Sequence, residues 1–103
     1  CAEAYYLRGM AHCSSRQFDQ AIADLDQAIR LAPKDPKPLV FRGMSYQQKG
    51  NLRQAIADFT EAIRLHPNLD IAYVRRAETY ELLGDATKAA ADWAKAKELE
   101  KSR

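Results

Sequence analysis

The sequence AIADLDQAIRLAP at Ala21–Pro33 returns thirty-four residues later as AIADFTEAIRLHP at Ala55–Pro67. A more divergent third copy, AAADWAKAKELEK, occupies Ala89–Lys101. A fixed period between about twenty and fifty residues is typical of proteins that stack one structural unit many times. Each unit contacts only its neighbours, and the stack presents a long surface that is usually concave. The repeat therefore predicts a scaffold for binding before it predicts anything else.

The repeat divides the chain into three rows of thirty-four residues, which begin at Ala2, Pro36 and Asp70 and are numbered from one. Each row contains two helical patterns separated by breaks. In the middle row, the apolar spacing predicts a helix over Pro36–Gln48 and a second helix over about Leu52–Leu65. Gly50 suits the left-handed residue past a helix end, and Asn51 suits the cap of the next helix. Gly84 and Asp85 repeat this device in the third row, whereas the first row has Arg16 and Gln17, the weakest turn. We therefore predict an all-α chain of six helices in three repeats, over residues 2–35, 36–69 and 70–103.

The two helices of each row are expected to pack as an antiparallel hairpin with a size-complementary interface. A turn between positions fifteen and sixteen of a row makes facing positions sum to about thirty-one, because short connections join antiparallel neighbours. Position eight then lies opposite position twenty-four, and a small residue meets a large one, which lets the helices approach closely. The three predicted pairs are Gly9 with Leu25, Gly43 with Phe59, and Ala77 with Trp93.

These positions resemble those of the tetratricopeptide repeat family. Its pattern has an aromatic residue at position four, Gly or Ala at eight, Tyr at eleven, Ala at twenty and twenty-seven, an aromatic residue at twenty-four and Pro at thirty-two. The resemblance covers the whole chain apart from Cys1, and it implies a right-handed superhelical solenoid that binds other proteins. The departures from the pattern are His12, Leu25, Ala77 and Lys101.

Composition and charge narrow the classes of partner. The net charge is only +2 and acids alternate with bases, whereas nucleic-acid or membrane-surface binding needs clustered basic charge. No apolar run is long enough to span a bilayer, and no signal peptide is visible. Cys1 and Cys13 lie too far apart along one helix to form a disulfide, so two free thiols predict a reducing, cytoplasmic compartment. The alternative for Cys1 is the lipidated first residue of a mature bacterial lipoprotein.

The residues that could carry chemistry do not form a site. His12 and Cys13 are adjacent, so on a helix they point about 100° apart and cannot act as base and nucleophile. His12 is instead expected to fill the place that Tyr occupies in the other rows. The cysteines and histidines lack zinc-ligand spacing, and no glycine-rich phosphate loop is present. We expect no enzyme activity, no metal and no cofactor.

Arginine recurs at position seven and aspartate at position twenty-three of every row. The hairpin rule brings each arginine close to the aspartate of its own row, so the two should form an ion pair. The aliphatic part of the arginine side chain is then expected to cover the edge of the core. The alternative is a ladder of arginines that binds an anion, but the recurring acid favours the structural interpretation. The predicted pairs are Arg8 with Asp24, Arg42 with Asp58, and Arg76 with Asp92.

The family resemblance places the partner-facing stripe on the first helix of each row, at positions two, five, nine and twelve. Several of these residues are apolar, and methionine suits an adaptable binding surface. The predicted partner-binding residues are Tyr6, Met10, Cys13, Val40, Met44, Gln47, Ile71, Val74, Arg75 and Glu78. The alternative is that a flanking helix or a neighbouring copy covers this stripe. Val40 and Met44 are expected to lie on the open face.

Family members that capture chaperone tails use a clamp of Lys, Asn, Asn, Lys and Arg. Of the equivalent residues here, only Arg75 matches, so we expect recognition of an apolar peptide segment rather than of a terminal carboxylate. The equivalent residues are Tyr6, Met10, Phe41, Ile71 and Arg75. The sequence thus predicts an interaction scaffold that binds a protein or peptide in its groove. The alternative function is a module that self-associates through the ends of its solenoid into a homo-oligomer.

Overall fold

The computed structural model describes residues 1–102 of the chain. Six α-helices follow one another with short turns between them, and the described residues contain no strand. The helices are α1 (Ala2–Ser14), α2 (Phe18–Leu31), α3 (Pro36–Lys49), α4 (Leu52–Leu65), α5 (Asp70–Leu83) and α6 (Ala86–Lys101). The all-α prediction is confirmed, and α3 and α5 begin at the first residues of the second and third predicted rows.

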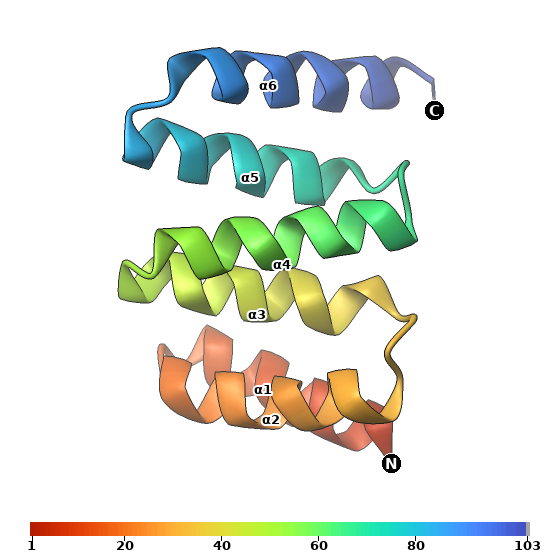
Figure 1. Ribbon diagram of the computed structural model, residues 1–103. Coiled ribbons are helices and arrows are strands. Elements are labelled where there is room, and N and C mark those ends of the chain that lie inside the picture. Colours follow the sequence, from red (N-terminus) through yellow and green to blue (C-terminus); the bar gives the residue numbers. More distant parts are fainter. Residues whose placement is uncertain (103) are drawn as a thin grey trace.

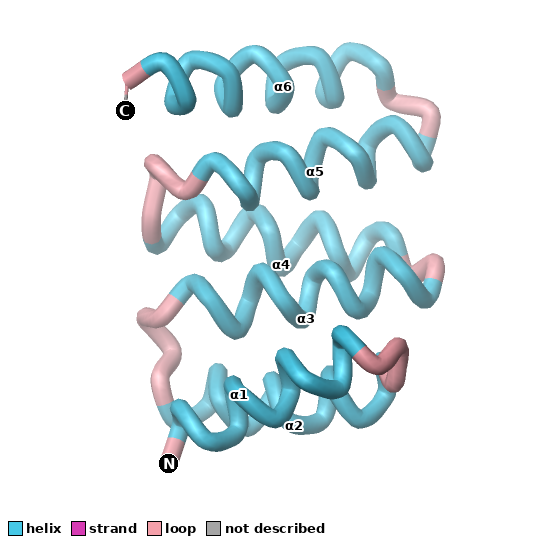
Figure 2. Tube along the Cα trace, turned by 180° about the vertical axis from the view of Figure 1, so that it is seen from behind, coloured by secondary structure: helices cyan, strands magenta, loops and turns pink. Residues whose placement is uncertain are grey.

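The three helical hairpins stack in chain order from one end of the molecule to the other, so the two termini lie at opposite ends (Figure 1). Each first helix packs on its own second helix, and each second helix packs on the next first helix. Helices α1, α3 and α5 also contact one another, whereas among the described residues α2, α4 and α6 do not. The first helices therefore form the inner, concave layer of a right-handed solenoid, on the side nearer the viewer in Figure 2.

The turns inside the repeats follow the predicted chemistry with one exception. Gly50 and Gly84 adopt left-handed φ angles of 85° and 83°, which glycine accepts without steric strain. Arg16 holds the same turn in the first repeat at φ 60°, so this is the strained one, as its sequence predicts. Asn51 occupies the N-cap position of α4, but its side chain does not cap the helix as expected. Its ψ of 70° lies short of the extended region that N-cap residues usually adopt.

Two of the three predicted small-to-large pairs pack directly against each other. A Cβ atom added at Gly43 would come within 2.6 Å of the Phe59 ring, and one added at Gly9 within 2.7 Å of Leu25. Leu25 and Phe59 are completely buried, so only glycine leaves room for them. Trp93, the third large residue of the series, is 37% exposed, because α6 has no following helix packed on it in the described residues.

Candidate functional site

An apolar cleft of about 310 Å³ opens in the concave layer between α1, α3 and α5. Its lining residues come from all three repeats, so no single repeat could form it. They are Tyr6, Lys37, Val40, Phe41, Met44, Leu69, Ile71 and Arg75. Five of the ten predicted partner-binding residues are among them, namely Tyr6, Val40, Met44, Ile71 and Arg75. The binding role of these residues stays a prediction, but the structure brings them to one place.

Two of the predicted residues are less accessible than expected. Val40 is only 4% exposed and belongs to the buried core with Leu39 and Phe59. The expectation that it lies on the open face is wrong, because α3 is the middle first helix and is covered by neighbours on both sides. Gln47, on the same helix, is also buried. Val40 therefore forms the floor of the cleft, while Met44 remains half-buried beside it.

The remaining predicted residues lie outside this cleft. Met10, Val74 and Glu78 are half-buried on α1 and α5. The Cys13 thiol lies 2.8 Å from the hydroxyl of Ser45, so it joins α1 to α3. Burial raises the pKa of the Cys13 thiol, although the hydrogen bond with Ser45 opposes this effect. Cys13 is therefore a protonated packing residue at neutral pH, and it is not activated as a nucleophile.

Arg75 is the one cation of the cleft that comes from the third repeat. One terminal nitrogen, Nη1, donates a hydrogen bond of 3.2 Å to Glu78 one turn later on α5. Its Nε atom is buried and has no hydrogen-bond partner. Phe41 and Ile71, which stand at two other positions equivalent to the chaperone clamp, present only apolar side-chain atoms to the cleft. The guanidinium thus lies at the edge of an apolar surface and is already neutralised by Glu78.

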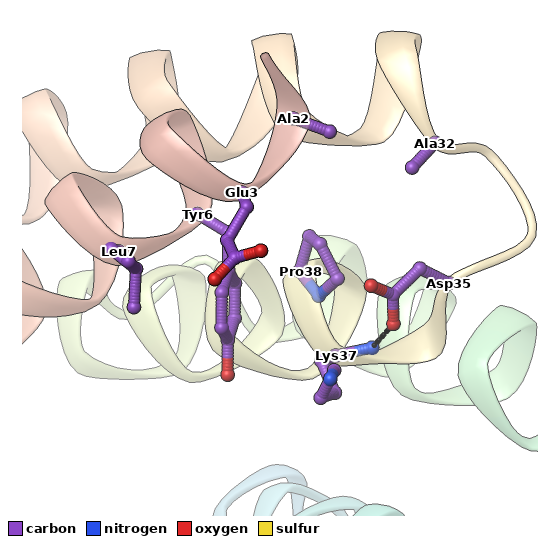
Figure 3. A pocket seen from close by; sticks show the side chains of 8 residues that line it. All are labelled: Ala2, Glu3, Tyr6, Leu7, Ala32, Asp35, Lys37 and Pro38. Atoms are coloured by element: carbon purple, nitrogen blue, oxygen red, sulfur yellow. Dashed lines mark hydrogen bonds between the residues drawn. The ribbon is translucent and has the colours of Figure 1, made fainter.

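A second cleft of about 320 Å³ lies at the start of α1 and α3 (Figure 3), and Tyr6 lines both this cleft and the apolar one. Its ring meets Phe41 edge-on at a centroid distance of 5.8 Å, which fixes the ring between the helices. The ammonium group of Lys37 lies 5.8 Å from the centre of the Tyr6 ring. Burial, and secondly the negative charge of Asp35, raise the pKa of the Tyr6 hydroxyl, so it is a neutral hydrogen-bonding group at pH 7.

The recurring arginines form the predicted ion pairs with the aspartates of their own repeats. Each guanidinium donates two hydrogen bonds of 2.7–2.9 Å to the two oxygens of one carboxylate. The pairs are Arg8 with Asp24, Arg42 with Asp58, and Arg76 with Asp92. The predicted ion pairs are therefore confirmed, and they engage two donors of each arginine, which favours the structural interpretation.

The same arginines also join one repeat to the next, which the sequence analysis missed. Arg42 donates a further hydrogen bond of 2.7 Å to Asp26 on α2, and Arg76 donates one of 3.1 Å to Thr60 on α4. Asp26 and Thr60 stand at the same position of their rows, so the sequence held a signal in the form of two consecutive acceptors at position twenty-five. The hydrogen bonds that Arg42 donates to Asp58 raise the pKa of Arg42 despite burial, so the guanidinium remains charged.

The other candidate groups have structural partners. His12 is not a simple core filler, because its Nδ1 lies 3.0 Å from Gln17 and its Nε2 lies 3.5 Å from Asp24. Within the described residues, Cys1 and Cys13 form no disulfide. Within residues 1–102, no three His, Cys, Asp or Glu side chains gather where a metal ion would need them, and no helix has the length and apolar character to cross a membrane.

Comparison with known proteins identifies the family. A family model described as Tetratricopeptide repeat matches residues 7–77, which is more than half of the chain. The chain belongs to the tetratricopeptide repeat family. A comparison with curated protein sequences finds no match.

Several solved structures share the whole fold of this tetratricopeptide repeat chain. A crystal structure of MamA superposes with a TM-score of 0.95 at 29% identity, over 99% of this chain and 60% of the MamA chain. The Arabidopsis OM64 tetratricopeptide repeat domain gives a TM-score of 0.95 at 26% identity, over 99% of this chain and 84% of that domain. The second tetratricopeptide repeat domain of Spaghetti (RPAP3), bound to the HSP90 peptide SRMEEVD, gives a TM-score of 0.92 at 23% identity, over 95% of this chain and 91% of that chain. The chain thus spans well under two thirds of the MamA chain that it matches.

Proposed function

We propose that this protein is a protein–protein interaction module whose concave groove binds a peptide segment through an apolar anchor side chain. The observation that carries the proposal is the chemistry at the positions equivalent to the chaperone clamp. Tyr6, Phe41 and Ile71 stand where the clamp has polar side chains, and they line one apolar cleft with Val40 and Met44. Such a cleft gains free energy by burying an aliphatic or aromatic side chain, at about 25 cal/mol per Å² of apolar surface.

A terminal carboxylate would find few donors in this groove. Arg75 is held by Glu78, and Ile71 and Phe41 have no polar side-chain atoms. Lys37, the other cation of the lining, is a single ammonium group beside the Tyr6 ring. A carboxylate placed here would lose its water without gaining a full set of hydrogen bonds, which is unfavourable. Tetratricopeptide repeat domains of the same fold do hold peptides, since the RPAP3 domain is solved with an HSP90 peptide. The shared fold therefore supports peptide capture, while the side chains of this chain favour an apolar sequence.

The test replaces a groove residue that can take a charge without unfolding the protein. Ile71 is 38% exposed, so Ile71→Glu leaves the charge in water in the free protein and buries it in the complex. The matched control is Leu82→Glu on the same helix, since Leu82 is 65% exposed and does not line the cleft. Both variants should keep the circular dichroism and melting behaviour of the parent.

The ligand for this test is an acetylated, amidated peptide with one central Leu flanked by Ser and Gly, compared with its Leu→Ala analogue. Binding is followed by amide shifts in nuclear magnetic resonance spectra of the labelled protein. We expect the Leu peptide to shift residues around Val40 and Met44, and Ile71→Glu but not Leu82→Glu to weaken it at least tenfold. Equal binding of the Leu and Ala peptides would refute apolar recognition.

Self-association is the second candidate, and exposed apolar residues at the two ends of the described solenoid favour it. Leu7 on α1 is 49% exposed, and Trp93 lies partly exposed on α6 at the other end. Each stands at a position that the neighbouring repeat covers in the middle of the solenoid. Light scattering over a concentration series tests this candidate, because stacking would raise the mean mass with concentration and a monomer would keep it constant.

We further infer a reducing, cytoplasmic location from the free thiols, and a role without catalysis.

A further inference from the structure

We propose that the bound segment carries an arginine or lysine beside its apolar anchor, and that this cation enters the second cleft, between Glu3 and Asp35 against Tyr6. The inference rests on the proposed function, because the apolar anchor in the first cleft sets the position of the segment. It adds a charge requirement, which apolar recognition alone does not contain.

The two clefts are neighbours along the groove, since Tyr6 and Lys37 line both of them. The second cleft is also lined by Ala2, Glu3, Leu7, Ala32, Asp35 and Pro38. An extended peptide places the side chains of residues i and i+2 on one face, about 7 Å apart. One peptide can therefore place two such side chains on either side of the Tyr6 ring.

The charges around the second cleft favour a cation. Glu3 and Asp35 both line it, and within residues 1–102 neither carboxylate has an ion-pair partner. Asp35 accepts one hydrogen bond, from the backbone of Lys37, and caps α3 with it. Figure 3 shows the Glu3 and Asp35 carboxylates on opposite sides of Pro38. Lys37 is the one cation in the lining, so two carboxylates face one ammonium group.

The walls of this cleft suit the rest of a long basic side chain. Leu7, Ala32 and Pro38 offer apolar contact for its methylene groups, as basic side chains commonly require. The Lys37 ammonium lies 5.8 Å from the centre of the Tyr6 ring, so this ring already contacts positive charge, and a bound cation would share or replace that contact. Arg75 and Lys37 line the first cleft, and Glu78, just outside it, pairs with Arg75, so the apolar anchor rather than the cation of the segment is expected there.

The experiment compares three peptides that differ at one residue, Ac-Gly-Ser-X-Ser-Leu-Ser-Gly-NH2 with X as Arg, Gln or Glu. Affinities come from nuclear magnetic resonance titrations of the whole chain at low salt. We expect the Arg peptide to bind about threefold more tightly than the Gln peptide, and the Glu peptide about threefold more weakly, as partly exposed charge pairs typically give. The Arg peptide should also shift amides at Glu3 and Asp35.

Two variants assign the preference to the named carboxylates. Glu3→Gln and Asp35→Asn should together remove the preference for the Arg peptide over the Gln peptide. Asp35→Asn should keep the helix cap, because Asn is as good an N-cap residue as Asp. The control Glu98→Gln, on α6 and away from both clefts, should leave it unchanged. Equal affinities for the Arg and Gln peptides, or tightest binding of the Glu peptide, would overturn the inference but leave the proposed function standing. Binding that does not depend on the Leu residue, or no binding by any peptide, would instead refute the proposed function.

Discussion

Replacing Arg42 by leucine should destabilise the protein far more than the same change at Arg8, although both arginines bind the equivalent aspartate of their repeat. The Asp58 side chain is 8% exposed, so Arg42→Leu leaves a nearly buried carboxylate without its cation. Removing one member of a buried ion pair costs about 3–5 kcal/mol. The variant also loses the bond from Arg42 to Asp26, which is one of the links from the second repeat to the first.

The Arg8 side chain is the matched control, because it is 63% exposed and, within residues 1–102, it bonds to Asp24 of its own repeat and not to another repeat. The Asp24 side chain is itself only 10% exposed, but the Arg8 side chain paired with it lies mostly in solvent, so its removal lets water reach the carboxylate, and His12 Nε2 stays 3.5 Å away. The loss at Arg8→Leu should therefore be smaller than the loss at Arg42→Leu. Urea unfolding followed by circular dichroism gives both losses at pH 7. Adding Asp58→Asn to Arg42→Leu removes the stranded charge, so the double variant should be less destabilised than the sum of its parts, by about 0.5–3 kcal/mol. Equal losses at Arg8 and Arg42, or strict additivity of the double variant, would refute this reasoning.

The dependence of stability on pH provides a second check, because the pKa values of the two aspartates are shifted in opposite directions. Burial raises the pKa of Asp58, and the hydrogen bonds from Arg42 oppose that rise. Without Arg42 the pKa should rise further, so the folded variant takes up a proton before the unfolded chain does. Its deficit relative to the parent should therefore be largest at neutral pH and shrink as the pH falls through the raised pKa. The hydrogen bond from Arg8 lowers the pKa of Asp24, so the Arg8→Leu deficit should persist until the pH falls below about 3.9, the ordinary value of Asp.

Other changes test the packing and the turns by the same urea assay. Phe59→Ala should cost about 3–5 kcal/mol because the ring is fully buried, and Trp93→Ala at the equivalent position should cost less because that ring is partly exposed. Similar losses would mean that the two rings are equally packed. Arg16→Gly should raise stability, since it relieves a left-handed backbone, whereas Gly50→Ala should lower it by about 1–2 kcal/mol. A loss at Arg16→Gly would show that the side chain outweighs the backbone strain.

The features that depend on one repeat could be predicted from the sequence. Glycine and proline set the helix ends, because the backbone conformations that they allow are local properties. The pairing of Gly43 with Phe59 follows from a short turn and two helices of equal length. The Arg–Asp pairs follow from the same arithmetic. Each of these contacts lies inside one hairpin, so neighbouring repeats do not alter it.

The features that depend on two or three repeats could not be predicted from one row at a time. Helical angles place Val40 beside Tyr6 and Val74 on the groove side, but they do not say how deeply each lies. Val40 is buried because α3 is covered by first helices on both sides, while α1 and α5 each have one such neighbour in the described residues. Leu69, which lines the cleft from the turn before α5, carries no periodic signal at all.

The arginine ladder shows how one recurring residue can take different physical roles along a solenoid. Arg8, Arg42 and Arg76 make the same two bonds within their hairpins, and Arg42 and Arg76, which follow another repeat in the described residues, each also reach an acceptor on it. The additional acceptor is charged for Arg42 and neutral for Arg76, so the first junction carries an ion pair and the second a weaker hydrogen bond. The junction between the first and second repeats should therefore be the more sensitive to salt and pH. That junction also contains Tyr6, so the position of α1 on α3 governs the shape of both clefts at the proposed site.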